Sequence, residues 1–207
     1  MKIKVCGITT IEQMQQLQDL GAEYAGMIFY EGSKRYIGGI RKSKAEIRNT
    51  GIKKVGVFVN ADFDTVVNAV NDYDLTAVQL HGDETDEFCL ELMDKVEVIK
   101  VFRIADQIDI DDLIAPFQNV CHYFLFDTDT ASFGGSGQQF DWNILKNAAI
   151  NKPFFLSGGI RLEDVAGIRS FRHPFLYAVD VNSRFEVQPG IKDMNKVALF
   201  IKAVRDE

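Results

Sequence analysis

The feature that most constrains the fold is an alternation of short apolar runs with stretches of helical spacing, which repeats eight times along the chain. The β-rich runs lie near 2–7, 24–30, 54–60, 77–82, 97–103, 122–127, 153–158 and 176–182. The candidate helices between them include 10–20, 62–72, 85–95 and 162–171. Runs that are apolar throughout are typical of strands buried on both faces, as in parallel sheets covered by helices. The alternation therefore predicts an α/β fold with a parallel sheet.

Start signals for helices support this assignment. Thr10 stands two residues ahead of Glu12, Asp62 opens the third helical stretch, and Thr85 precedes two acidic residues. Eight βα units without a composition break favour a compact (β/α)8 TIM barrel, formed as a single domain by residues 1–207. A doubly wound open sheet is the alternative, although such sheets more often have fewer strands.

Composition narrows the function classes. A formal net charge of −7 argues against nucleic-acid binding, but it leaves room for one small phosphorylated ligand held by local N–H groups. The three cysteines are far apart and form no Cys/His cluster, so neither a disulfide framework nor a metal site is indicated. No apolar stretch is long enough to span a membrane, and the amino terminus lacks the pattern of a signal peptide. We therefore expect a cytoplasmic protein without membrane contact.

The most informative stretch for function is 124–142, where an apolar run ends in the carboxylate of Asp127 and a glycine-rich loop follows. Ligands bind at the carboxyl ends of parallel strands, so Asp127 is the first candidate for chemistry. The alternative is that Asp127 only caps the turn that follows. Gly134 to Gly137 have the composition of a loop that closes over a ligand.

Cys6 ends the first run, where its thiol could face the same mouth of the barrel. A free cysteine is most often an inert buried hydrophobe, and that reading stays open. With a pKa of ~8.5, an ordinary thiol is only a few per cent ionised at neutral pH. A nearby cation or helix amino terminus would raise the thiolate fraction and make Cys6 a usable base.

Polar groups end most of the other runs as well. Gly158 and Gly159 after the seventh run, and Asn182 and Ser183 after the eighth, stand where such barrels commonly bind phosphate. The other strand-end candidates are Asn60, His81, Arg103, Ser157 and Asp180. Arg35, in the loop after the second run, is the best cation for a ligand carboxylate because its planar fork can bind both oxygens. His81 is too isolated to indicate a metal ligand.

Eight motifs, in order along the whole chain, resemble the phosphoribosylanthranilate isomerase family. They are Lys-Val-Cys-Gly-Ile-Thr at 4–9, Ser-Lys-Arg-Tyr at 33–36, Val-Gly-Val-Phe-Val-Asn at 55–60, Val-Gln-Leu-His-Gly-Asp-Glu at 78–84, Phe-Asp-Thr at 126–128, the Gly-Gly-Ser-Gly and Phe-Asp-Trp segment at 134–142, Ser-Gly-Gly-Ile at 157–160 and Pro-Gly-Ile-Lys-Asp at 189–193. This resemblance implies a cofactor-free (β/α)8 barrel of tryptophan biosynthesis.

The implied reaction is an Amadori rearrangement of N-(5-phosphoribosyl)anthranilate to 1-(2-carboxyphenylamino)-1-deoxyribulose 5-phosphate. By the same resemblance, Asp127 is the general acid at the ribose ring oxygen and Cys6 the general base at C2. Arg35 holds the anthranilate carboxylate, and Gly158, Gly159, Asn182 and Ser183 hold the phosphate. Asp180 and His81 complete the expected substrate site, and no metal is required. Because Asp127 must carry a proton to serve as the acid, we expect its pKa to be raised.

Two departures from the family pattern affect the expected site. Ser-Lys-Arg-Tyr replaces the usual Ser-Pro-Arg-Tyr, and Arg184 stands where the family usually has a glycine. If that position requires a positive φ, Arg184 is strained; if not, its guanidinium can reach the phosphate. The alternative functions are a different phosphosugar barrel and a barrel that binds phosphosugars without catalysis. The sequence leaves open whether the protein is a monomer or a homodimer.

Overall fold

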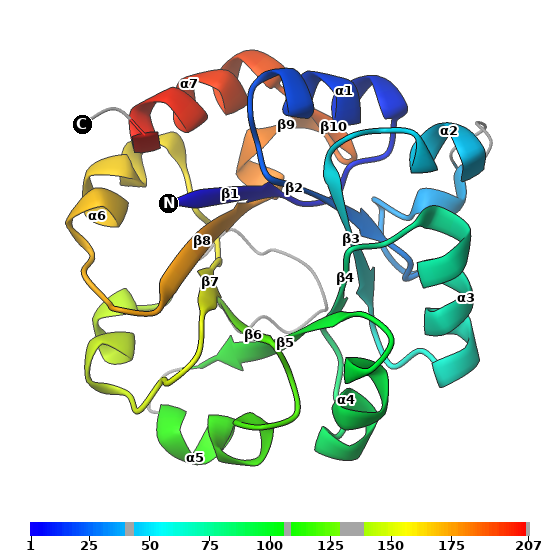
Figure 1. The fold of residues 1–207 in the computed structure, drawn as a ribbon. Helices are drawn as coiled ribbons and strands as arrows, with labels where there is room; N and C mark the ends of the chain where they lie inside the picture. Colours follow the sequence, from blue (N-terminus) through cyan, green and yellow to red (C-terminus); the bar gives the residue numbers. More distant parts are fainter. Residues whose placement is uncertain (40–43, 106–108, 129–138, 206–207) are drawn as a thin grey trace.

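Eight parallel strands close into a barrel in the computed structural model, which describes residues 1–39, 44–105, 109–128 and 139–205 (Figure 1). Each strand pairs with the next in the sequence, and β8 pairs with β1 to close the ring. The strands are β1 (Lys2–Val5), β2 (Tyr24–Ile28), β3 (Lys53–Phe58), β4 (Ala77–Leu80), β5 (Glu97–Ile104), β6 (Tyr123–Thr128), β7 (Phe154–Leu156) and β8 (Leu176–Val181). The predicted (β/α)8 barrel is confirmed, and the open sheet is excluded.

Most strands are shorter at their carboxyl ends than the apolar runs in the sequence. Cys6, Asn60 and His81 lie just past the ends of β1, β3 and β4. The backbone N–H groups of Cys6 and His81 still donate to carbonyl groups of the neighbouring strands, at the point where the ladder ends and the mouth of the barrel begins. The apolar runs predicted as strands therefore extend into the first residues of the loops at the barrel mouth.

The helices surround the strands in Figure 1. They are α1 (Ile11–Asp19), α2 (Lys44–Arg48), α3 (Phe63–Tyr73), α4 (Asp86–Met93), α5 (Ile110–Ile114), α6 (Val165–Ser170) and α7 (Met194–Arg205). Thr10, Asp62 and Thr85 each accept a hydrogen bond from a backbone N–H of the first turn, so the three predicted amino-terminal caps are confirmed. After β6, the segment opened by Phe-Asp-Trp forms only a 3-10 helix, Trp142–Asn147. No helix of the described residues is long and apolar enough to cross a membrane.

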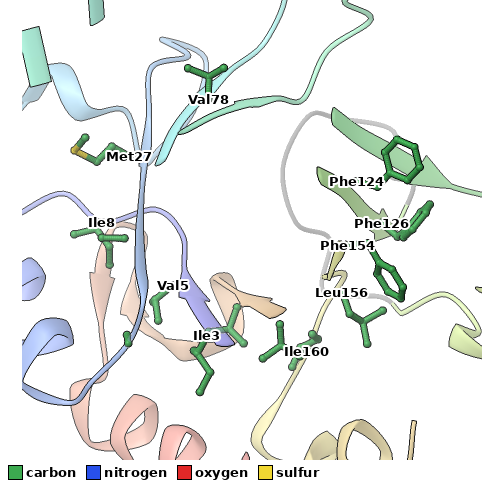
Figure 2. Close-up of a cluster of buried hydrophobic side chains, with 14 of the residues drawn as sticks. Ile3, Val5, Ile8, Met27, Val78, Phe124, Phe126, Phe154, Leu156 and Ile160 are labelled. Carbon is green, nitrogen blue, oxygen red and sulfur yellow. The ribbon is translucent and has the colours of Figure 1, made fainter. Parts of the chain in front are cut away.

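Side-chain alternation along each strand divides the core into two parts. Phe124 and Phe126 on β6 point outward, where they meet Phe154 on β7 and the surrounding helices (Figure 2). Leu125, between them, points into the barrel and packs with Phe155 and other residues of the interior cluster. Because the period is two, Asp127 shares the interior face with Leu125. The core therefore aims this carboxylate into the barrel mouth.

We predict that Phe124→Ala lowers the free energy of unfolding by about 3–5 kcal/mol, because it removes a large side chain from a close-packed site. Phe124 is fully buried, and its ring contacts those of Phe102 and Phe126. Urea denaturation monitored by circular dichroism measures the change. The matched control is Phe175→Ala, whose side chain is 36% exposed and which should cost less than about 1 kcal/mol. Equal losses in the two variants would contradict this account of the core.

Candidate active site

A cavity of about 430 Å³ opens at the carboxyl ends of the strands. Side chains from both halves of the barrel line it, among them Cys6, Arg35, Gln79, His81, Asp127, Ser157, Gly159, Asp180, Asn182, Ser183 and Arg184. The sequence predicted eight of these as members of the site: Cys6, Arg35, His81, Asp127, Gly159, Asp180, Asn182 and Ser183. Gly158, which was also predicted, lies beside the cavity without lining it. The described residues contain no cluster of three or more potential metal ligands.

Asp127 enters the cavity from the end of β6, and its surroundings favour the protonated carboxyl group. Burial raises the pKa of Asp127 to about 6, and the carboxylate of Asp180 adds to the shift. The backbone N–H of Thr128 donates a 2.8 Å hydrogen bond to Oδ1 and partly opposes it. The raised pKa expected from the sequence is therefore confirmed. Such a group can carry and donate a proton near neutral pH.

His81 lies beside Asp127, with Nε2 3.5 Å from Oδ2. Burial, together with the charges of Lys4, Arg103 and Lys100, lowers the pKa of His81 to about 4. The imidazole is therefore neutral at physiological pH and forms no ion pair with Asp127. On its other side, Nδ1 lies 3.5 Å from Nε2 of Gln79. His81 thus joins the acid to a polar residue deeper in the barrel.

Cys6 lies past the end of β1, and its side chain packs with Ile28, Val57 and Tyr30. Burial raises the pKa of the thiol, while the ammonium group of Lys4 opposes that shift. From the sequence we expected that a nearby cation or helix amino terminus would increase the thiolate fraction. Cations are present, but burial outweighs them, so the free protein holds Cys6 mainly as a thiol.

Lys4 and Asp180 form a fully buried ion pair below Cys6, with 2.8 Å between Nζ and Oδ2. Burial disfavours the charged form of Lys4, but the Asp180 carboxylate outweighs that effect and raises the Lys4 pKa. One oxygen of Asp180 is therefore committed to Lys4, while Oδ1 has no hydrogen-bond partner among the described residues. Asp180 contributes to the floor of the cavity and not to a loop at its rim.

Arg35 is held at the cavity by Glu186, which follows β8. Its Nε donates to both carboxylate oxygens at 2.9 and 3.1 Å, and Nη2 donates to Oε2 at 2.7 Å. Lys192 donates to Oε1 of Glu186 and to Oδ1 of Asn182, both at 2.7 Å. Glu186 therefore occupies one edge of the guanidinium group. These bonds do not involve Nη1 of Arg35, and they fix the plane of its guanidinium group.

The loop after β7 has the backbone that close approach to a ligand requires. Gly158 and Gly159 have φ values of 91° and 64°. A Cβ atom on Gly158 would lie 2.4 Å from Oγ1 of Thr128, so only glycine fits there. Gly159, Asn182 and Ser183 line the same cavity.

Arg184 replaces a glycine of the family pattern without strain, because it lies in a short 3-10 helix, Ser183–Phe185, and has no left-handed backbone. It also lines the cavity. The position therefore tolerates a side chain without backbone strain, and contact between the Arg184 guanidinium and a phosphate stays a prediction.

Four functional candidates were not found from the sequence: Lys4, Gln79, Glu186 and Lys192. Three of them could have been found: Lys4 and Gln79 are polar residues within apolar strands, and Lys192 falls within the Pro-Gly-Ile-Lys-Asp motif. Two strand-end candidates are structural instead. Asn60 accepts a hydrogen bond from the backbone of Asp83, and Arg103 pairs with the Asp83 side chain. The glycine-rich loop 134–137 lies outside the described residues.

Comparisons with known proteins agree with this geometry. Residues 3–203 match the family model described as N-(5'-phosphoribosyl)anthranilate isomerase. The enzyme of that name from Parabacteroides distasonis is 40% identical over 207 residues, covering 99% of this chain and 93% of the relative.

Two solved structures are also similar. One contains monomers generated from the dimeric isomerase of Thermotoga maritima (31% identical, TM-score 0.81, covering 100% of this chain and 99% of that one). The other is an isomerase in complex with reduced 1-(o-carboxyphenylamino)-1-deoxyribulose 5-phosphate (31% identical, TM-score 0.81, covering 99% and 98%).

The raised pKa of Asp127 predicts a specific dependence of stability on pH. Between about pH 4 and 6 the folded state binds more protons here than the unfolded state, so ionisation of Asp127 destabilises the fold as pH rises. A shift from 3.8 to about 6 corresponds to about 3 kcal/mol at most. Asp127→Asn cannot ionise, and its free energy of unfolding relative to wild type should rise by up to this amount from pH 4 to pH 7. Urea titrations at both pH values measure it; parallel pH profiles would show that Asp127 titrates normally.

Proposed function

Because the chain belongs to the N-(5'-phosphoribosyl)anthranilate isomerase family of tryptophan biosynthesis, we propose that Asp127 and Cys6 are the acid and base of its reaction. The isomerase converts N-(5-phosphoribosyl)anthranilate to 1-(2-carboxyphenylamino)-1-deoxyribulose 5-phosphate. One proton must be supplied to the ribose ring oxygen and another removed from C2. The observation that carries the proposal is the presence of a carboxyl group with a raised pKa and a thiol in one cavity at the barrel mouth.

In the first step, Asp127 donates its proton to the ring oxygen. The bond between C1 and this oxygen breaks, and the anthranilate nitrogen forms a double bond to C1. A protonated carboxyl group is required, because a carboxylate has no proton to give. Burial in the cavity, which raises the pKa of Asp127 to about 6, keeps a useful fraction of the acid form near neutral pH.

In the second step, Cys6 removes the proton from C2, and the electrons of that bond neutralise the iminium nitrogen. The enolamine then becomes the ketone when its C2 hydroxyl loses a proton and C1 gains one, so atoms and charge balance. The iminium makes the C2 proton acidic, and a modest base suffices. The ammonium groups of Lys4 and Lys192 lower the pKa of the thiol and so favour the thiolate form of Cys6.

Binding of the two ends of the substrate is assigned by charge. The phosphate is held by the backbone of Gly159 and by Asn182 and Ser183, with Gly158 shaping the turn. Arg184 supplies a guanidinium group to the same wall. Arg35 holds the anthranilate carboxylate with the edge of its fork that Glu186 does not occupy.

The substrate's own iminium acts as the electron sink, so the mechanism calls for neither a metal nor an organic cofactor. A similar isomerase structure contains a reduced form of the phosphorylated product, which supports a small phosphorylated ligand here. A similar enzyme from Thermotoga maritima is described as dimeric, and we propose a monomer or a homodimer for this chain. We further propose a cytoplasmic location without nucleic-acid or membrane partners, in keeping with the net charge of −7.

Cys6→Ala and Asp127→Asn should each lower kcat by at least about 100-fold, because general acid–base groups typically contribute 10²–10⁴-fold. The assay is the loss of phosphoribosylanthranilate fluorescence after the substrate is generated in situ, with a chelator present. Both variants should keep the circular dichroism spectrum of the wild type. A wild-type rate in either variant would remove that residue from its assigned role.

Arg35→Ala should raise KM by about 10- to 100-fold with a smaller effect on kcat, because it removes a charged hydrogen-bond partner of the substrate carboxylate. The matched control is Arg205→Ala. Arg205 is also paired with a carboxylate, that of Glu23, but it lies outside the cavity. Steady-state kinetics of both variants test the assignment, and an unchanged KM in Arg35→Ala would exclude Arg35 from carboxylate binding.

A further inference from the structure

Gln79 is a polar residue on the interior face of β4, where its side chain is only 2% exposed. Its amide oxygen Oε1 is buried and has no hydrogen-bond partner among the described residues. Its amide nitrogen lies 3.5 Å from Nδ1 of His81. A buried acceptor without a partner destabilises the fold, and an apolar side chain here would avoid that cost. Stability of the barrel therefore does not account for Gln79.

The unpartnered oxygen belongs to the wall of the active-site cavity. Gln79 lines this cavity, and so does Asp180, whose Oδ1 is the other unpartnered acceptor on the floor. Both side chains are more than nine-tenths buried. Two acceptors on one floor call for a ligand with two hydrogen-bond donors. The ribose of the substrate has two vicinal hydroxyl groups, on C2 and C3, next to the reacting atoms.

The neighbours of each acceptor distinguish the two hydroxyl groups. Asp180 on β8 lies opposite Lys4 on β1, and Lys4 is two residues before Cys6. Asp180 therefore lies on the side of the base that acts at C2. Gln79 contacts His81, which contacts Asp127, so it lies on the side of the acid. The ring oxygen that Asp127 protonates joins C1 to C4. C2, next to C1, lies on the side of the base, which leaves C3, next to C4, for the side of the acid. Gln79 is therefore placed for the C3 hydroxyl and Asp180 for the C2 hydroxyl.

We propose that Gln79 is a specificity-determining residue whose Oε1 accepts a hydrogen bond from the C3 hydroxyl of the substrate ribose. This inference rests on the proposed roles of Cys6 and Asp127, because those roles orient the sugar. The orientation of the Gln79 amide agrees with this proposal. Neutral His81 with its proton on Nε2 has a lone pair on Nδ1, and the amide nitrogen of Gln79 lies next to that lone pair. The amide oxygen therefore points toward the ligand.

The test is a cycle of two enzymes and two substrates. The enzymes are the wild type and Gln79→Met, which keeps a similar length but removes the acceptor. The substrates are phosphoribosylanthranilate and its 3-deoxy analogue, prepared by condensing anthranilate with 3-deoxyribose 5-phosphate. We expect kcat/KM of the wild type to fall about 10- to 100-fold when the C3 hydroxyl is removed. Gln79→Met should lose a similar factor on the natural substrate but differ from the wild type by less than about threefold on the analogue.

General damage to the barrel would lower kcat/KM for both substrates by the same factor, and that result would overturn the proposal. Wild-type enzyme that converts the 3-deoxy analogue with unchanged kcat/KM would also overturn it, and this arm does not depend on the variant folding. The cycle compares ratios in enzymes that retain Cys6 and Asp127. Failure of the acid and base assignments would appear in the Cys6→Ala and Asp127→Asn rates and not in these ratios.

Discussion

Closure of the barrel between β1 and β8 is the constraint on which the rest of the structure depends. Without this seam the ladder would be an open sheet, and the two loops that follow β7 and β8 would not face Cys6. The register of the seam pairs Lys4 with Asp180, and the same two residues form the buried ion pair. Removing one partner of such a pair leaves an uncompensated buried charge, which costs several kcal/mol. The pair therefore disfavours a shifted register at the point where the two ends of the sheet meet.

The period-two alternation of strand side chains turns this closed ring into a site. On β6 the outward residues are phenylalanines that pack against helices, and the inward residues lead from Leu125 to Asp127. The same alternation on β4 gives Ala77, Gln79 and His81 to the interior. A shift of one residue in either strand would exchange the core for the catalytic groups. The alternation that packs the core therefore also places the site residues at the mouth of the barrel.

The two sides of the cavity differ in the charges that lie close to the reacting groups. On the side of β4 and β6, burial keeps His81 neutral and favours the protonated form of Asp127, so the direct neighbour of the acid carries no charge. On the side of β1 and β8, Lys4 and Lys192 are paired with Asp180 and Glu186, which places cations beside the thiol of Cys6. One cavity can therefore hold a group that donates a proton and a group that accepts one.

The sequence by itself determined the fold class, the number and order of the barrel strands, three helix caps and eight of the residues that line the cavity. These follow from local patterns: apolar runs, capping residues and polar groups at strand ends. It misjudged the ends of most strands, because the point where a strand leaves its neighbour depends on the neighbour.

Only the tertiary structure decided which polar residues meet. Asn60 and Arg103 end strands as His81 does, yet both bind Asp83 and stay out of the site. The roles of Lys4, Gln79 and Glu186 depend on contacts across the barrel with residues more than a hundred positions away or on burial in its floor. The balance of charges around Cys6 is of the same kind, since desolvation and electrostatic interactions depend on distances in space and not on spacing along the chain.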